Sequence, residues 1–137
     1  MRSSCPLNFA LELFGDKWTL LIIRDIMFFN KHYFNEFLAS DEKISSNILA
    51  GRLAMLEQEQ FIAKEKDKNH KQKIRYYLTE KGIDLLPILV EIGCWSGKYG
   101  ESIVDSRMHS FLSRIKEEGP ESFSKMREAL YSQRTGS

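Results

Sequence analysis

One segment of the chain is apolar on nearly every side. Residues 17–29 read KWTLLIIRDIMFF, and Asp16, directly before them, is a residue type that caps helices. A helix that is hydrophobic all round belongs in the middle of a core. The remainder of this 137-residue chain is therefore expected to pack around it, and its length suits one domain with an appended helical segment.

Shorter amphipathic helices are predicted on both sides of this segment. Pro6 suits the first turn of a helix that carries apolar residues at i, i+3, i+4 and i+7 and stops at Gly15. After a turn at residues 30–32, a short helix is expected over 33–38. Ser45 then occupies an N-cap position, which predicts a helix from about Ser46 to Gln58.

The pattern changes to strict alternation after residue 60. Residues 61–67 and 73–79, joined by KNHKQ, predict an antiparallel hairpin, and Thr79 caps a long helix that Pro87 bends or restarts. Two more helices follow: the first has apolar residues from Val104 to Ile115, and the second comes after Gly119 and Pro120. The last six residues, SQRTGS, are expected to be frayed.

This order of elements predicts an α+β, mostly helical fold: a winged helix-turn-helix with a two-stranded wing and C-terminal dimerisation helices. We expect a DNA-binding domain over residues 1–100 and a helical extension and tail over residues 101–137. In a winged helix-turn-helix, the helix at 46–58 lies in the major groove of DNA, and the hairpin tip reaches an adjacent backbone or minor groove.

The helix at 46–58 has an unusually bare side. Its leucines repeat at helical spacing, whereas the opposite side carries Ser46, Asn47, Ala50 and Gly51, which are small or uncharged. A solvent-facing helix usually carries long Lys and Glu side chains, so this side is suited to close approach. The alternative is an ordinary surface helix with few charges.

Several side chains on or beside this helix could contact DNA. Asn47 can donate to and accept from an adenine edge, and Arg52, if it points outward, can grip guanine or a phosphate. Ser45 and Ser46 suit phosphate contacts at a helix N-terminus.

Positive charge is concentrated at the hairpin. Between Lys64 and Arg75 there are six basic residues against two acidic ones, although the whole chain has a formal net charge of only +1. Such a run is often just a solvated face, but beside a bare helix it favours binding to the DNA backbone. The candidate contacts in the wing are Lys66, Lys68, Asn69, His70, Lys71, Lys73 and Arg75.

These segments together resemble the HxlR-type winged-helix transcriptional regulators of bacteria. The resemblance rests on CP at 5–6, GDKWTLLIIRDI at 15–26, YFNEF at 33–37, ISSNILAGRLAMLE at 44–57, YYLTEKG at 76–82, and LLPIL at 85–89 with Trp95. It implies a homodimer that binds double-stranded DNA and whose interface uses the first helix and the long helix after the wing.

The two cysteines differ in their surroundings. In some similar regulators an N-terminal cysteine at the position of Cys5 senses electrophiles or oxidants, and a thiol just ahead of a helix can have an enriched thiolate. The alternative for Cys5 is a half-buried thiol at the dimer seam without a signalling role. Cys94, on an apolar helix, is expected to be core packing. Two such distant cysteines provide neither a disulfide framework nor a metal knuckle, which fits the reducing cytoplasm.

Other classes of function find less support in the sequence. An enzyme is not expected, because His32, His70 and His109 lack paired-ligand spacing and no GxSxG elbow is present. No metal, cofactor, membrane span or secretion signal is expected either. A protein-interaction module without sequence-specific DNA binding is the competing interpretation, and a small-molecule effector stays open.

Overall fold

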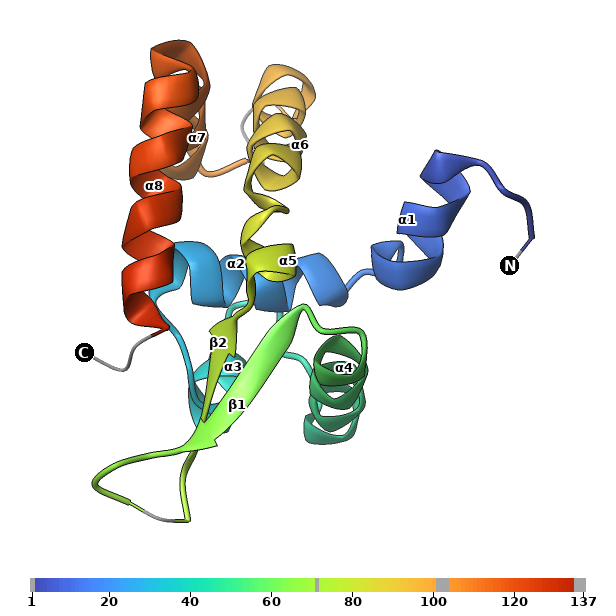
Figure 1. The fold of residues 1–137 in the computed structure, drawn as a ribbon. Coiled ribbons are helices and arrows are strands. Elements are labelled where there is room, and N and C mark those ends of the chain that lie inside the picture. The colour runs from blue at the N-terminus through green and yellow to red at the C-terminus, as the bar shows by residue number, and fades with distance from the viewer. Residues whose placement is uncertain (1, 71, 101–103, 135–137) are drawn as a thin grey trace. The chain divides into compact units, whose positions relative to one another are not determined.

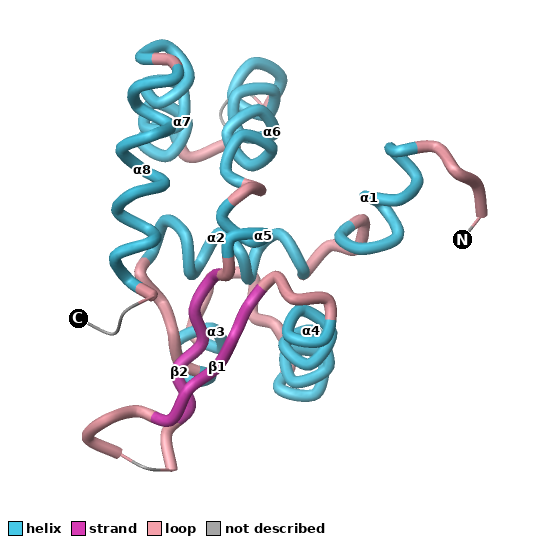
Figure 2. Tube along the Cα trace, in the orientation of Figure 1, coloured by secondary structure: helices cyan, strands magenta, loops and turns pink. Residues whose placement is uncertain are grey.

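The computed structural model describes residues 2–70, 72–100 and 104–134 (Figure 1). The chain divides into two compact units, Met1–Leu78 (unit 1) and Thr79–Ser137 (unit 2), which are described separately below. It is mostly helical with one two-stranded antiparallel sheet, as the predicted fold class requires (Figure 2). The functional division into residues 1–100 and 101–137 stays a prediction.

Unit 1 contains four helices and the hairpin. Their bounds are α1 Pro6–Phe14, α2 Thr19–Phe29, α3 Phe34–Leu38, α4 Ser46–Gln58, β1 Ile62–Lys66 and β2 Ile74–Leu78. The predicted helices are confirmed within one or two residues, except that the central one starts at Thr19. Asp16 still caps it, because Asp16 Oδ2 accepts hydrogen bonds from the backbone N–H groups of Trp18 at 2.9 Å and Thr19 at 3.1 Å.

The prediction that α2 lies in a core is confirmed. Ile22, Ile23, Ile26 and Met27 are at most 3% exposed. The other buried apolar residues of unit 1 come from α3, α4, the segments before and after α4, and the hairpin: Phe37, Ile44, Leu49, Leu53, Leu56, Phe61, Ile62 and Leu78. Since each fully buried side chain of this size contributes about 1.5–3 kcal/mol, α2 is the central support of unit 1.

The hairpin pairs in one register, from Ile62 opposite Leu78 to Lys66 opposite Ile74. Each strand is one residue shorter at both ends than the predicted 61–67 and 73–79. The turn after α2 is tied to β2, because Tyr76 N–H donates to the His32 carbonyl at 2.8 Å. The buried His32 ring lies against the same strand, with Nδ1 2.8 Å from the Tyr76 carbonyl oxygen.

Unit 2 consists of helices. These are α5 Glu80–Ile83, α6 Leu86–Tyr99, α7 Ser106–Glu118 and α8 Pro120–Gln133. Thr79 caps α5 and Pro87 lies in the first turn of α6, so the predicted restart is confirmed. Val104 precedes α7 rather than lying in it, because the Asp105 side chain caps that helix. The prediction of a frayed end was wrong at Ser132 and Gln133, which are helical, and residues 135–137 lie outside the described residues.

Helix α6 has two different long faces. On one, Gly93 and Gly97 receive α7: a Cβ at Gly97 would lie 1.7 Å from His109 Cδ2, and one at Gly93 would lie 2.1 Å from Leu112 Cδ1. The glycines of GCWSGKY therefore serve helix packing. The opposite face is apolar and exposed, at 39% for Ile88, 47% for Ile92, 66% for Trp95 and 59% for Tyr99.

We predict that Gly97→Ala destabilises the protein, because the added methyl group overlaps the His109 ring. Overpacking of this kind costs about 1–3 kcal/mol, partly offset by the better helix propensity of Ala. Gly51→Ala in α4 is the matched control, since its Cβ would meet no atom within 4 Å. This substitution should raise the free energy of unfolding by up to about 1 kcal/mol. Urea unfolding measures both, and equal stability of the two variants would contradict the packing argument.

Candidate nucleic-acid interface

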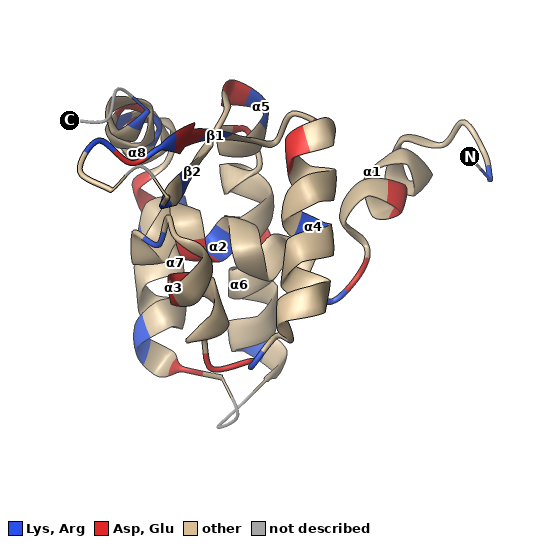
Figure 3. Cartoon of the chain, turned by 90° about the horizontal axis from the view of Figure 1, so that it is seen from below, with Lys and Arg blue, Asp and Glu red and all other residues tan. Residues whose placement is uncertain are grey.

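Helix α4 presents the predicted bare face to solvent. Ser45 Oγ accepts a hydrogen bond from Ile48 N–H at 3.3 Å and caps the helix. The leucines at 49, 53 and 56 are buried, whereas the predicted contact residues Ser45, Ser46, Asn47, Ala50 and Gly51 are all exposed. Figure 3 shows no charged residue in the first half of α4. This side of α4 is therefore open to solvent and carries no long charged side chain.

Ile48 belongs to the same surface, although it is not among the residues predicted from the sequence. It is 41% exposed and follows Asn47 directly. An exposed apolar side chain at this point can contact the methyl group of thymine, which only the major groove presents. Helical periodicity alone could have predicted this exposure, since the 3.6-residue period places Ile48 at one edge of the exposed side.

The position of Arg52 differs from the one that a base contact requires. Its Nε lies 3.4 Å from Asp16 Oδ2, and its side chain is 39% exposed. Arg52 is therefore on the flank of α4 that faces the turn between α1 and α2, so the condition that the prediction set for a guanine contact, an outward-pointing side chain, is not met in this conformation. In this conformation a guanine contact from Arg52 is not supported.

The predicted contact residues of the wing fall into two groups, those exposed to solvent and one that is turned toward the hairpin. Lys66, Lys68, Asn69, His70 and Lys73 are exposed, and Lys71 lies outside the described residues. Lys66 and Lys68 form no ion pair within the described ranges, so their charges are available to a ligand. Arg75 was predicted as a contact but is turned toward the hairpin: its side chain is 14% exposed, with Nη1 3.3 Å from Glu65 Oε1.

Tyr33 ties the wing to the start of α3. Its hydroxyl donates to Asp67 Oδ1 at 2.6 Å, and Asp67 Oδ2 accepts from the N–H groups of Asn69 at 3.0 Å and His70 at 3.1 Å. Lys73 Nζ lies 4.1 Å from the centre of the Tyr33 ring. The hydrogen bond from Tyr33 is the main cause that lowers the pKa of Asp67. No local pattern pointed to this contact, because the two residues are 34 positions apart.

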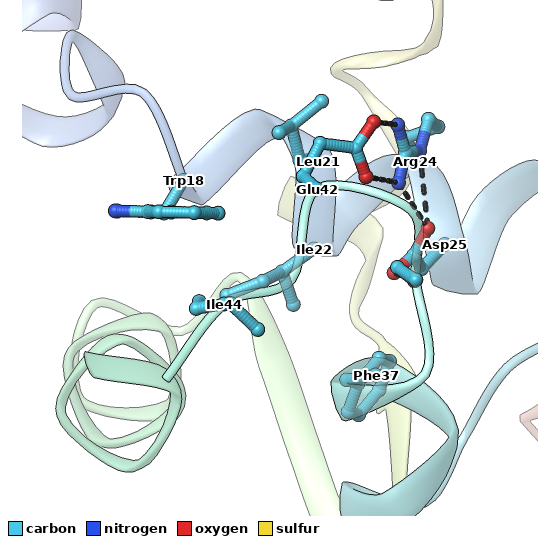
Figure 4. A pocket seen from close by; sticks show the side chains of 9 residues that line it. Trp18, Leu21, Ile22, Arg24, Asp25, Phe37, Glu42 and Ile44 are labelled. Carbon is cyan, nitrogen blue, oxygen red and sulfur yellow. Dashed lines mark hydrogen bonds and ion pairs between the residues drawn. The ribbon is translucent and has the colours of Figure 1, made fainter. Parts of the chain in front are cut away.

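A partly buried ionic network fixes the connector that leads into α4 (Figure 4). Arg24 on α2 donates to both carboxylate oxygens of Glu42, at 2.7 and 2.8 Å, and to Asp25 Oδ1 at 2.7 Å. Ser40 Oγ donates to Asp25 Oδ2 at 2.6 Å and accepts from Lys31 Nζ at 2.7 Å. Although burial disfavours the charge, the hydrogen bonds with Glu42 and Asp25 raise the pKa of Arg24.

Helix α4 and the wing belong to the same unit and lie on the same side of α2. In Figure 1, α4 and the tip of the hairpin both extend from that side, and Figure 3 views the chain from there. Helix α4 also contacts β1 directly. The two elements thus offer an uncharged helix face and a cationic loop together.

The two thiols lie in different places. Cys5 is exposed and directly precedes α1, and Cys94 on α6 is half-buried. The backbone N–H of Asn8, and then that of Leu7, lower the pKa of Cys5, although no side-chain hydrogen bond caps the helix.

Within the described ranges, no three His, Cys, Asp or Glu side chains are grouped as metal ligands. No helix described there is both long and apolar enough to cross a membrane.

Comparison with known proteins identifies the family. Residues 13–104 match the family model described as HxlR-like helix-turn-helix. The chain belongs to this family. The family resemblance and the winged-helix fold predicted from the sequence are thereby confirmed.

Two relatives from Bacillus subtilis are named HTH-type transcriptional regulators. YodB is 34% identical over 101 residues, which cover 73% of this chain and 89% of YodB. YdeP is 32% identical over 99 residues, which cover 72% of this chain and 77% of YdeP. HxlR-family proteins of this kind are regulators of transcription, and this chain shares that general role.

Solved structures of two redox-related regulators have the same fold. The reduced form of the redox regulator HypR superposes with a TM-score of 0.63 at 29% identity, covering 72% of this chain and 97% of HypR. Reduced YodB from B. subtilis gives 0.58 at 29% identity, covering 75% of this chain and all of YodB. YodB has also been solved with a bound quinone and after diamide treatment.

We predict that Tyr33→Phe raises the pKa of Asp67 toward the ordinary value of a carboxyl group, because the main hydrogen bond to the carboxylate is lost. A lowered pKa in the folded state means that the contact stabilises the fold above the ordinary Asp pKa and is lost as the pH falls through the lowered one. NMR titration of the Asp67 carboxyl carbon measures the change. Tyr77→Phe on β2 is the control, and identical Asp67 titrations in both variants would contradict the assignment.

Proposed function

We propose that this protein is a homodimeric, cytoplasmic regulator that binds a pseudo-palindromic promoter site. Helix α4 of each subunit enters a major groove and the wing contacts the neighbouring backbone. The observation that carries the proposal is the exposed, uncharged face of α4 together with exposed lysines on the wing in one compact unit. Two such helices read half-sites about 34 Å apart, or a multiple of that distance.

The two parts of the surface have different tasks. Asn47 and Ile48 are placed to read bases, through an amide that can pair with adenine and an alkyl group that can pack on thymine. Ser45, Ser46, Lys66 and Lys68 suit phosphate oxygens, which fix position without reading sequence. Sequence preference therefore comes from α4, and the lysines of the wing make the binding salt-dependent.

Two apolar helix faces support the homodimer. Helix α1 has no buried residue and exposes Leu7 at 74%, Phe9 at 52% and Leu11 at 56%. On α6, the stripe of Ile88, Ile92, Trp95 and Tyr99 is also exposed. Apolar side chains gathered at helical spacing usually mark an interaction surface, and a second copy of the chain is the partner that the family resemblance implies.

The proposal predicts different losses from two substitutions, tested on an operator selected from a random duplex library. Asn47→Ala should cost about 1–3 kcal/mol per subunit on that operator and little on unrelated DNA. Lys68→Ala should weaken all duplexes alike and reduce the log–log salt slope by about 0.9 per lost phosphate contact.

Mobility-shift titrations across salt concentrations measure both effects, and the native complex should hold two chains per duplex. If no duplex is retarded even at low salt, the proposal is wrong and a protein-interaction module takes its place.

We further propose that Cys5 makes the regulator responsive to electrophiles. The exposed thiolate can add to a ring carbon of a quinone: an S–C bond forms, the ring takes up the electron pair and a proton, and the product is a hydroquinone thioether. The lowered pKa of Cys5 favours the reactive thiolate. Similarity to the redox regulator HypR, and to YodB, which has been solved with a bound quinone, supports this role.

We therefore predict that a quinone changes the operator affinity of the native protein but not that of Cys5→Ser. Cys94→Ser is the matched control and should respond like the native protein, because Cys94 is half-buried on α6. Operator affinity before and after treatment, together with the mass of the adduct, provides the measurement. An unchanged response in Cys5→Ser would remove Cys5 from the mechanism.

A further inference from the structure

A charged depression separates α1 from α4. Arg52 on α4 lies in it with three carboxylate residues, Glu12, Asp16 and Glu59, while Leu11 and Met55 add apolar surface. Arg52 is the only basic residue of α4, so its position decides whether that helix offers a cation to DNA.

Asp16 is the fixed member of its pair with Arg52. Its Oδ2 accepts from the N–H groups of Trp18 and Thr19, and its Oδ1 accepts from the Thr19 hydroxyl, so the carboxylate cannot move without uncapping α2. Thr19 is itself fully buried, which holds the cap further. The Asp16 carboxylate is thus held in place independently of Arg52.

Arg52 is the movable member. Its Nε lies 3.4 Å from Asp16 Oδ2, and its guanidinium donates no hydrogen bond to any residue that the structure describes. An exposed pair with one such contact changes an equilibrium by about five-fold at most. A guanidinium that meets a phosphate through two nitrogens makes a stronger, charge-assisted contact. A phosphate can therefore displace Asp16 from Arg52.

The position of Arg52 on the helix determines which part of DNA it can reach. It follows Gly51 by one residue and so lies about 100° further around the axis, beyond the edge of the bare face. A long side chain at that edge points to the sugar-phosphate wall of a groove, while the centre of the face points to the bases. Arg52 is suited to phosphate and not to base recognition.

We propose that Asp16 and a DNA phosphate compete for Arg52, so that Asp16 is a positioning residue that weakens DNA binding. The inference rests on the proposed DNA-binding function. In free protein Arg52 pairs with Asp16, and in the complex it turns from Asp16 to the backbone of the duplex. The affinity of the regulator for DNA then depends partly on Asp16, which lies in the turn between α1 and α2 and contacts no DNA itself.

A double-mutant cycle tests the competition, using Asp16→Asn, Arg52→Ala and the two combined. Asn keeps an oxygen that can cap α2 but removes the charge that holds Arg52. Asp16→Asn should tighten operator binding up to about five-fold per subunit at low salt, and Arg52→Ala should weaken it. In the Arg52→Ala background, Asp16→Asn should have no effect on affinity or on the salt slope.

Glu12→Gln is the matched control. Glu12 lies in the same depression but pairs with Arg2 at 2.8 Å, so its loss removes a negative charge without releasing Arg52. Its effect on affinity should be small and independent of Arg52. The competition is overturned if Asp16→Asn weakens binding while its thermal midpoint is unchanged, or if it tightens binding equally with and without Arg52.

A measurement on the native protein covers the case in which Asp16→Asn fails to fold. The Nε–H resonance of Arg52 and the carboxyl-carbon resonance of Asp16 should both shift when operator DNA is added. Binding without either shift would overturn this inference alone. If the native protein retards no duplex, the proposed function and this inference fail together.

Discussion

The placement of α4 depends on one half-buried arginine. Arg24 lies on the central helix with its side chain only 17% exposed, between Asp25 and Glu42. A buried charge is tolerated only when it is paired, and removing one partner leaves the other uncompensated. Because Glu42 belongs to the connector before α4, the pairing that neutralises Arg24 also fixes where α4 begins.

The proposed DNA surface combines two elements. Helix α4 has a lowered helix propensity at Gly51, and the loop of the wing is held by a hydrogen bond to Tyr33. Gly51 lowers helix propensity by about 1 kcal/mol relative to Ala, and its position is open, so packing does not require it. The burial of three leucines on the other side holds the helix instead. In the wing, the hydrogen bond between Tyr33 and Asp67 holds the loop, while Lys66 and Lys68 are exposed and form no ion pair with any described residue. The buried leucines and the Tyr33–Asp67 hydrogen bond thus hold the exposed residues of α4 and the wing in fixed positions, which the proposed recognition of DNA requires.

Unit 2 shows how one helix can serve two purposes. The glycines at 93 and 97 let α7 approach one side of α6 closely, and this leaves the large apolar side chains on the opposite side exposed. Helices α7 and α8 lie beyond residue 104, where the match to the family ends. Within this unit, Asp84 next to α5 and Arg127 on α8 form an ion pair at 2.5 Å, so the added helices are fastened at more than one point.

The sequence by itself determined the order of the elements and most of their limits. The range Ser46–Gln58 and its cap at Ser45 were predicted as observed, and the strands were predicted within one residue, since capping and periodicity are properties of neighbouring residues. Tertiary structure alone decided the partners of the charged and aromatic side chains. Asp16 meets Arg52, Tyr33 meets Asp67 and Gly97 meets His109 across loops whose closure no local pattern encodes. The family and the exposed, uncharged side of α4 could therefore be predicted, whereas the ion pairs of Arg52 with Asp16 and of Arg75 with Glu65 could not.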